Sequence, residues 1–111
     1  MTADLVIGLD AGTSVIKAVA FTPDGAQIDA AAMPNQVDRV ADGGAEQDAV
    51  RTWDDAARTL RLLAEKIPDL ARRTAGLAVT GQGDGTWLID SAGAPVAPAW
   101  LWLDARSGAI V

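Results

Sequence analysis

The sequence predicts an α/β domain built on a mixed β-sheet, with its elements in the order β-β-β-α-β-β. Two apolar runs rich in β-branched residues, 5–10 and 15–21, have the composition of buried strands. A long amphipathic helical pattern follows, and an apolar run at 75–83 comes after it. A helix between the third and fourth strands suggests a crossover that brings the fourth strand parallel to the first. With 111 residues, the chain suffices for one such domain.

The first three strands are expected to form two consecutive hairpins. Residues 5–10 end at Asp10, and residues 15–21 follow after a short polar segment. The tetrapeptide 22-TPDG-25 has proline second and glycine last, which is typical of a type I turn. It should reverse the chain into a third strand at 26–33, antiparallel to the second.

A polar segment and an amphipathic helix come next. Residues 34–44 are polar with a Gly-Gly pair, which predicts an exposed loop. Beyond it, apolar residues recur at steps of three and four up to Ile67, with charged residues on the opposite face. Asp48 is the expected N-cap, and Pro68 should end or kink the helix.

After the helix, residues 75–83 predict a strand that opens onto a glycine-rich loop, and 86–90 predict a short fifth strand before the turn 91–95. A helix starting at Ser107 has no room to develop before the last residue. One helix cannot cover both faces of a five-stranded apolar sheet. We therefore expect a fold that is incomplete at its C-terminus, with marginal stability and no turnover in isolation.

Composition limits the chemistry and the partners. The net charge of −6 and pI near 4.3 disfavour nucleic acid and acidic membrane surfaces as partners. Cysteine, histidine and tyrosine are absent, which leaves no thiol nucleophile, imidazole base or disulfide. No apolar stretch approaches the roughly 20 residues that a membrane span needs, and the N-terminus lacks a basic leader region. A cytoplasmic location is the expectation.

The first candidate site is the segment 10-DAGTS-14. Glycine at position 12 permits a positive φ, so that backbone N–H groups converge with the hydroxyls of Thr13 and Ser14 on a phosphate. Asp10 would hold a hydrated Mg²⁺, and Lys17 would add a cation facing the same oxygens. The alternative is an ordinary Asp-Gly hairpin turn whose lysine extends to solvent. A lysine inside an apolar strand favours the phosphate.

Two later segments carry groups suited to sugar or polyol hydroxyls. In 80-TGQGDGTW-87, glycines would let the backbone approach a ligand beside Gln82 and Asp84, although a loose turn explains the glycines equally well. In 99-AWLWLDAR-106, an extended chain would place Trp102, Asp104 and Arg106 on one face, with an indole plane against a sugar. The alternative there is a core tryptophan beside a surface ion pair.

Taken together, four motifs resemble the N-terminal part of the FGGY carbohydrate kinases, which share a superfamily with actin and heat-shock chaperone ATPases. The segment 8-GLDAGTSVIKAVAFTPDG-25 is similar to the family's first phosphate motif, and 77-LAVTGQGDG-85 to its substrate-binding turn. The segment 46-EQDAVRTW-53, whose acidic start is by its own chemistry a helix cap, resembles the family's Glu-Gln-Asp helix start, and 99-AWLWLDAR-106 its Trp-x-Asp-x-Arg segment.

The resemblance implies a ribonuclease H-like (actin-like ATPase) fold and an ATP- and Mg²⁺-dependent kinase acting on a sugar or polyol. Residues 1–111 would form the N-terminal portion of the substrate-binding domain, with the rest of that domain, the catalytic base and the second domain further along. The implied roles are metal binding for Asp10, phosphate binding for Gly12, Thr13, Ser14 and Lys17, and substrate binding for Gln82, Asp84, Trp102, Asp104 and Arg106. No residue here takes the role of base.

One departure from the family bears on the substrate, and two other functions stay open. Many members carry a large side chain where Gly83 stands, and the Gln-Gly-Asp-Gly turn resembles that of erythritol-type kinases.

A ribonuclease H-like nuclease would instead bind two metals with Asp10, Asp84 and Asp104. The chain would otherwise be a non-catalytic nucleotide- or sugar-binding module, or a truncated product. A homodimer of the full-length protein also stays open.

Overall fold

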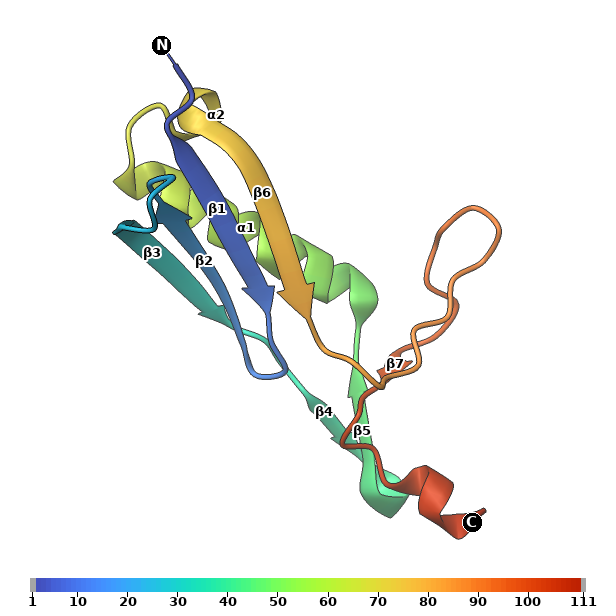
Figure 1. The fold of residues 1–111 in the computed structure, drawn as a ribbon. Helices are drawn as coiled ribbons and strands as arrows, with labels where there is room; N and C mark the ends of the chain where they lie inside the picture. The colour runs from blue at the N-terminus through green and yellow to red at the C-terminus, as the bar shows by residue number, and fades with distance from the viewer. Residues whose placement is uncertain (1, 111) are drawn as a thin grey trace.

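The computed structural model describes residues 2–110 and shows a four-stranded sheet, a long helix lying against it and a smaller sheet beyond one end of its strands (Figure 1). The larger sheet has the strand order β3-β2-β1-β6. Its strands are β1 (Leu5–Ala11), β2 (Val15–Phe21), β3 (Gln27–Pro34) and β6 (Thr74–Gly81).

The pairing in this sheet confirms the mixed α/β fold class. β1 pairs antiparallel with β2, and β2 pairs antiparallel with β3. β6 lies parallel to β1 on its other side, after the crossover through α1 (Ala49–Lys66) and α2 (Leu70–Arg73). The 22–25 segment forms the expected turn, with the Gly25 N–H donating to the Thr22 carbonyl at 2.9 Å.

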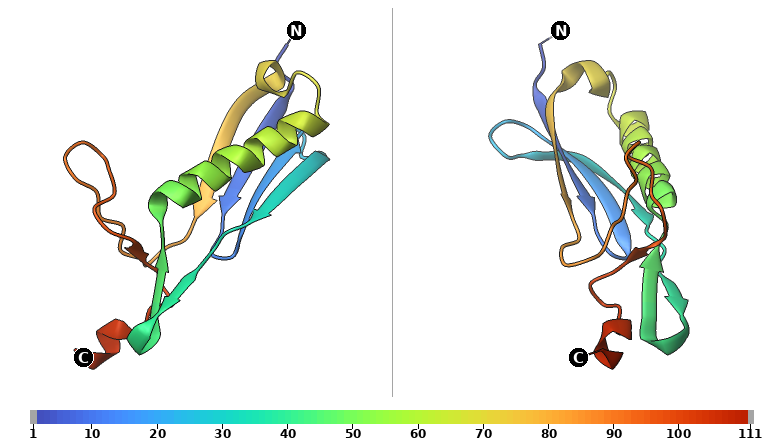
Figure 2. Two further views of the ribbon diagram at one scale, coloured as in Figure 1. Left: turned by 180° about the vertical axis from the view of Figure 1, so that it is seen from behind. Right: turned by 90° about the vertical axis from the view of Figure 1, so that its right-hand side faces the viewer.

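Helix α1 begins and ends where the sequence predicts. The Asp48 side chain accepts a hydrogen bond from the Arg51 N–H at 2.9 Å, which is the expected N-cap. The last helical residue is Lys66, two residues before Pro68. The helix crosses one face of the sheet, over β1, β2 and β3 (Figure 2).

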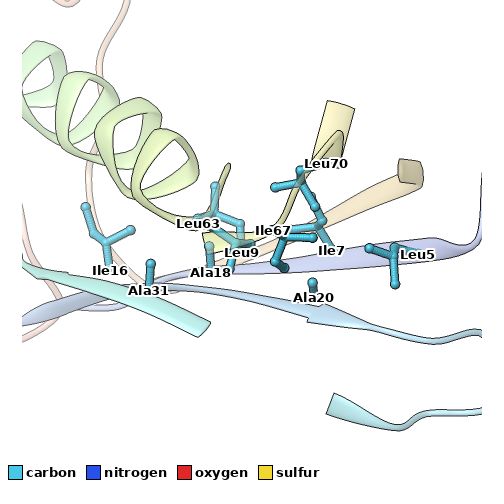
Figure 3. Close-up of a cluster of buried hydrophobic side chains, with 10 residues drawn as sticks. All are labelled: Leu5, Ile7, Leu9, Ile16, Ala18, Ala20, Ala31, Leu63, Ile67 and Leu70. Carbon is cyan, nitrogen blue, oxygen red and sulfur yellow. The ribbon is translucent and has the colours of Figure 1, made fainter. Parts of the chain in front are cut away.

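The core lies between α1 and this face of the sheet (Figure 3). Alternate residues of β1 and β2 point toward the helix, as the period of two in a strand requires. Leu63 of α1 is completely buried against them. The ten core residues are Leu5, Ile7, Leu9, Ile16, Ala18, Ala20, Ala31, Leu63, Ile67 and Leu70.

Helix α1 does not cover strand β6. Leu77 and Val79 are 47% and 62% exposed, whereas their neighbours in β1 are buried. The molecule is elongated, with extents of 55 × 29 × 21 Å, and its radius of gyration of 16.6 Å exceeds the roughly 13 Å of a compact chain of this size. Much of the sheet surface is therefore apolar and uncovered.

Residues 34–44 are not the exposed loop that their polarity suggests. They contribute to a second, three-stranded sheet of order β4-β5-β7, formed by β4 (Asp38–Val40), β5 (Gly44–Gln47) and β7 (Ala99–Trp100). A 3-10 turn, η1 (Ala41–Gly43), connects β4 and β5, with positive φ at Asp42 and Gly43. The Gly-Gly pair thus marks a hairpin turn and the start of a strand.

The fifth strand expected at 86–90 does not join the larger sheet. Thr86 and Ile89 make isolated bridges to Trp100 and Pro95, within an arm that projects from the molecule (Figure 1). The side chain of Asp90 accepts from the Ala92 and Ala94 N–H groups, and this turn folds the segment back on itself. Local pairing thus replaces pairing with β6.

Near the end of the described residues, the helix expected to start at Ser107 is a short 3-10 helix, η2 (Arg106–Ala109). Among the helices of residues 2–110, none has the length and apolar character needed to cross a membrane.

Candidate functional site

The loop between β1 and β2, residues 12–14, lies at the end of the sheet nearest the smaller sheet (Figure 1). Gly12 is required here by close packing, because a Cβ atom would lie 2.8 Å from the Val15 carbonyl oxygen. Its φ is not positive, so the expected left-handed conformation is wrong for this glycine. The Asp10 carboxylate lies beside it, with Oδ1 3.7 Å from the same Cβ position.

Asp10 and Lys17 face each other across the β1–β2 pair. Both side chains are exposed on the sheet face opposite the helix, where they line a hollow of about 360 Å³. Thr80 of β6 lies at the same end, while Val19 and Phe21 supply an apolar wall. Of the residues predicted to bind metal and phosphate, Asp10 and Lys17 therefore share one open surface, while Gly12, Thr13 and Ser14 do not line it.

A second hollow, of about 330 Å³, lies between this loop and the segments that follow β6 and β7. It brings together Thr13, Gln82, Asp84 and Trp102, which come from three widely separated segments of the sequence. Asp84 adopts a positive φ of 57°, which is uncommon outside glycine. Gly12, Gly81 and Gly83 complete the lining.

Thr13 connects the phosphate loop to this pocket. Its hydroxyl donates to Gln82 Oε1 at 3.0 Å and accepts from Trp102 Nε1 at 3.0 Å. The indole is 59% exposed, so its ring presents an apolar surface to the pocket. A residue expected to bind phosphate thus also orients two residues expected to bind substrate.

Gln47 is a site residue that sequence reasoning missed. Its side chain is completely buried, donates from Nε2 to the Thr13 carbonyl at 2.7 Å and accepts from Gln82 Nε2 at 2.7 Å. The acidic segment 46–48 predicts a helix cap, a role that Asp48 performs. A polar residue two positions before the helix gives no local signal of burial.

Asn35 is the second missed residue. It is 4% exposed, and its Nδ2 donates to the Gly12 carbonyl at 2.8 Å. Its backbone N–H donates to the Ser14 carbonyl, also at 2.8 Å. The residue lies between β3 and β4, in the region where the sequence predicted an exposed loop.

Asp104 and Arg106 lie outside the lining of the pocket. The chain turns after Trp100, so the predicted extended face shared by Trp102, Asp104 and Arg106 is wrong. The Asp104 carboxylate accepts from the Ala45 N–H at 2.8 Å and from the Arg106 guanidinium at 2.6 Å. This hydrogen bonding to Arg106 holds the pKa of Asp104 well below its usual range, against the effect of burial.

Arg106 joins several partners in one cluster. It pairs with Glu46 at 2.8 Å, and its guanidinium carbon lies 3.5 Å from the centre of the Trp100 ring. The contact with Asp104 raises the pKa of Arg106. The Asp104 side chain is only 5% exposed. The pair therefore connects the segment after β7 to β5 and leaves little of the carboxylate accessible to a ligand.

The three aspartates of the nuclease hypothesis do not meet. Within residues 2–110, no group of three or more acidic side chains could hold a metal. Asp10 and Asp84 line different hollows, and Asp104 is bound to Arg106. A two-metal centre built by these residues is thus not supported.

A single Mg²⁺ of the kinase type does fit the residues present. Mg²⁺ prefers one or two carboxylates, with waters and phosphate oxygens as its other ligands. Asp10 is an exposed carboxylate beside the loop at Gly12 and opposite Lys17. It would be the protein ligand, and bound phosphates would have to supply others.

Solved structures define the class of protein. The chain superposes on a xylulose kinase from Rhodospirillum rubrum with a TM-score of 0.88 and 30% identity, covering 95% of this chain and 22% of that one. A kinase from Brucella ovis, described as a xyloylose kinase, gives the same TM-score at 29% identity, with 93% and 22% covered. The fold is therefore that of sugar kinases with an actin-like ATPase architecture.

The sequence then shows the family. Residues 5–111 match the N-terminal domain of the FGGY family of carbohydrate kinases, and the chain belongs to this family. It is 54% identical to an erythritol kinase from Brucella abortus over 108 residues, which is 97% of this chain and 21% of that protein. It is 34% identical to a xylulose kinase from Streptomyces rubiginosus, over 93% of this chain and 20% of that one. The chain thus spans about a fifth of the length of these relatives.

Proposed function

We propose that the full-length protein transfers the γ-phosphoryl group of ATP to a hydroxyl of a small polyol. These 111 residues would supply the first phosphate loop and one wall of the polyol pocket. The proposal draws on the family and on the identity of 54% to an erythritol kinase. Erythritol or a polyol of similar size is the substrate class it favours.

The observation that carries the proposal is the position of Thr13. Its backbone belongs to the loop beside Asp10, and its hydroxyl bonds both Gln82 and Trp102. Kinases catalyse phosphoryl transfer mainly by holding the acceptor and the phosphate in line. A residue common to the loop and the pocket fixes the relative position of the two.

Each group on the two hollows then has a role. Asp10 would hold Mg²⁺, which supplies charge neutralisation to the phosphates when bound. Lys17 would add a second positive charge, while the loop N–H groups donate to phosphate oxygens. In the pocket, Asp84 would accept hydrogen bonds from the polyol hydroxyls, and the Trp102 ring would pack against the C–H groups of the polyol.

The transfer itself needs one group from outside these residues. The polyol oxygen forms a bond to the γ-phosphorus as the bond to the bridging oxygen of ADP breaks, and the hydroxyl proton passes to a base. A carboxylate further along the full-length chain would accept this proton. The residues described here bind and orient the reactants.

Gly83 supports a small and flexible acceptor. A Cβ at this position would meet no atom within 4 Å, and its φ is not positive, so neither packing nor backbone conformation demands glycine. The residue lines the pocket beside Asp84. Its missing side chain leaves room for substrate.

The test is a substrate panel on the purified full-length protein. ADP release is followed with ATP, Mg²⁺ and a set of tetritols, pentitols, glycerol, ketoses and aldoses. We expect turnover with a four-carbon polyol to exceed turnover with xylulose or glycerol. If ATP is left intact with every member of the panel, the kinase proposal fails; if a ketose is the best substrate, the polyol assignment fails.

A further inference from the structure

The three carbonyl groups of the loop at residues 12–14 are all hydrogen-bonded to protein donors. The Gly12 carbonyl accepts from Asn35 Nδ2 and the Thr13 carbonyl from Gln47 Nε2. The next carbonyl, that of Ser14, accepts from the Asn35 backbone N–H. Three successive carbonyls are therefore bound by only two residues.

This anchoring fixes the direction of the loop N–H groups. In a trans peptide, the C=O of one residue and the N–H of the next point in opposite directions, and residues 2–110 contain no cis bond. The Thr13 and Ser14 N–H groups therefore point away from Asn35 and Gln47. Within residues 2–110, neither N–H donates to another protein group.

The side chains that hold the loop are themselves constrained. Asn35 and Gln47 are 4% and 0% exposed. Gln47 continues to Gln82, which accepts from the Thr13 hydroxyl, so Thr13, Gln82 and Gln47 form a closed ring of hydrogen bonds. Such a ring resists rotation of the peptide groups because a turn of any one breaks a buried hydrogen bond.

We propose that Asn35 and Gln47 are positioning residues that aim the Thr13 and Ser14 N–H groups at the nucleotide phosphates. This rests on the proposed kinase function. The two residues differ in their hydrogen bonds: within residues 2–110 those of Asn35 reach only the loop, whereas Gln47 also holds Gln82 of the polyol pocket. Asn35 thus acts on nucleotide binding, and Gln47 acts on both ligands.

The experiment measures ADP and polyol binding separately by calorimetry on the full-length protein. Asn35→Leu and Gln47→Met keep the approximate side-chain volume and remove the donors. Losing one loop anchor is expected to weaken ADP binding about 3- to 10-fold, the range given by one hydrogen bond. Asn35→Leu should leave polyol binding unchanged, whereas Gln47→Met should weaken it as well.

Gln36→Met is the matched control, since Gln36 is exposed and its amide bonds only to Asp38. It should change neither binding constant. If Asn35→Leu and Gln47→Met lower the melting temperature yet bind ADP as tightly as the wild type, the two residues are merely structural and the inference is overturned.

A second variant guards against poor folding. Gln47→Glu retains the acceptor for Gln82 but, when ionised, loses the donor for Thr13. Burial raises the pKa of such a carboxyl, and its protonated form regains a donor. ADP affinity of this variant should therefore recover as the pH is lowered, relative to the wild type. A constant ratio across pH would contradict the inference.

The two proposals fail in different ways. If the protein phosphorylates no polyol but ADP binding still weakens in both variants, the positioning role stands and the polyol kinase proposal falls. If polyol turnover is confirmed but neither Asn35→Leu nor Gln47→Met changes ADP binding, only the positioning role is overturned.

Discussion

The larger and the smaller sheet of this chain are stabilised by different kinds of interaction. In the larger sheet, apolar side chains of β1 and β2 are buried under α1, and adjacent strands are joined by short turns or one crossover. In the smaller sheet, β5 and β7 pair through only two residue pairs. There the Asp104–Arg106–Glu46 cluster and the Gln47–Gln82–Thr13 ring add connections to the few buried apolar residues, Ala45, Ala99 and Leu101.

The difference separates a scaffold from a site. Burial of apolar surface is non-directional and tolerates small displacements. Buried hydrogen bonds require defined distances and angles, and therefore fix the positions of a few polar groups. The larger sheet holds the apolar core, and the hydrogen bonds around the smaller sheet fix the positions of Thr13, Gln82 and Trp102.

The largest expected effect is a loss of stability in the larger sheet. Leu63→Ala removes a completely buried side chain and should lower the free energy of unfolding by about 2–5 kcal/mol. Leu62→Ala is the matched control on the same helix, because Leu62 is 37% exposed and should cost much less. Denaturant unfolding of the full-length protein measures both. If both variants lost the same free energy of unfolding, the helix face that covers the sheet would contribute no more to stability than the exposed face.

A smaller and pH-dependent effect is expected in the polar region. Asp104→Asn should lower the melting temperature at pH 7 by less than Leu63→Ala does. The pKa of Asp104 is depressed in the fold, so its contribution is complete above the unfolded pKa, about 3.9, and is lost as the pH falls toward the folded pKa.

The difference in melting temperature between the wild type and Asp104→Asn should therefore shrink below about pH 4. Asp54→Asn serves as control, since Asp54 is exposed on α1. Thermal unfolding from pH 7 to pH 3 gives the comparison. A difference that stays constant over this range would show that the Asp104–Arg106 contact is not an ionic one.

The smallest effect on stability is expected at Gly83. Open space surrounds this position, so Gly83→Met should leave the melting temperature unchanged. Its side chain would occupy the pocket and raise KM for the polyol about tenfold, with Gly83→Ala in between. ATP kinetics should not change. A Gly83→Met protein with the wild-type KM would place the polyol elsewhere.

The elements predicted from the sequence are those with local signals. Two apolar runs predicted β1 and β2, the TPDG turn predicted the reversal into β3, and Asp48 and Pro68 predicted the bounds of α1. The failures have a common cause. β5 joins a sheet by pairing with β7, and Thr86 bridges to Trp100 of β7, so the local polarity of 34–44 and the apolar run at 86–90 were misleading.

The sequence by itself determined the fold class, the family and the loop that follows Asp10, because these depend on short-range periodicity and contiguous motifs. Only the tertiary structure decided which polar residues work together. Thr13 meets Gln82 and Trp102 across 69 and 89 positions, and Gln47 and Asn35 reach the loop from strands or connections far along the chain. Hydrogen bonds act over about 3 Å, so their partners exist only once the sheets are assembled.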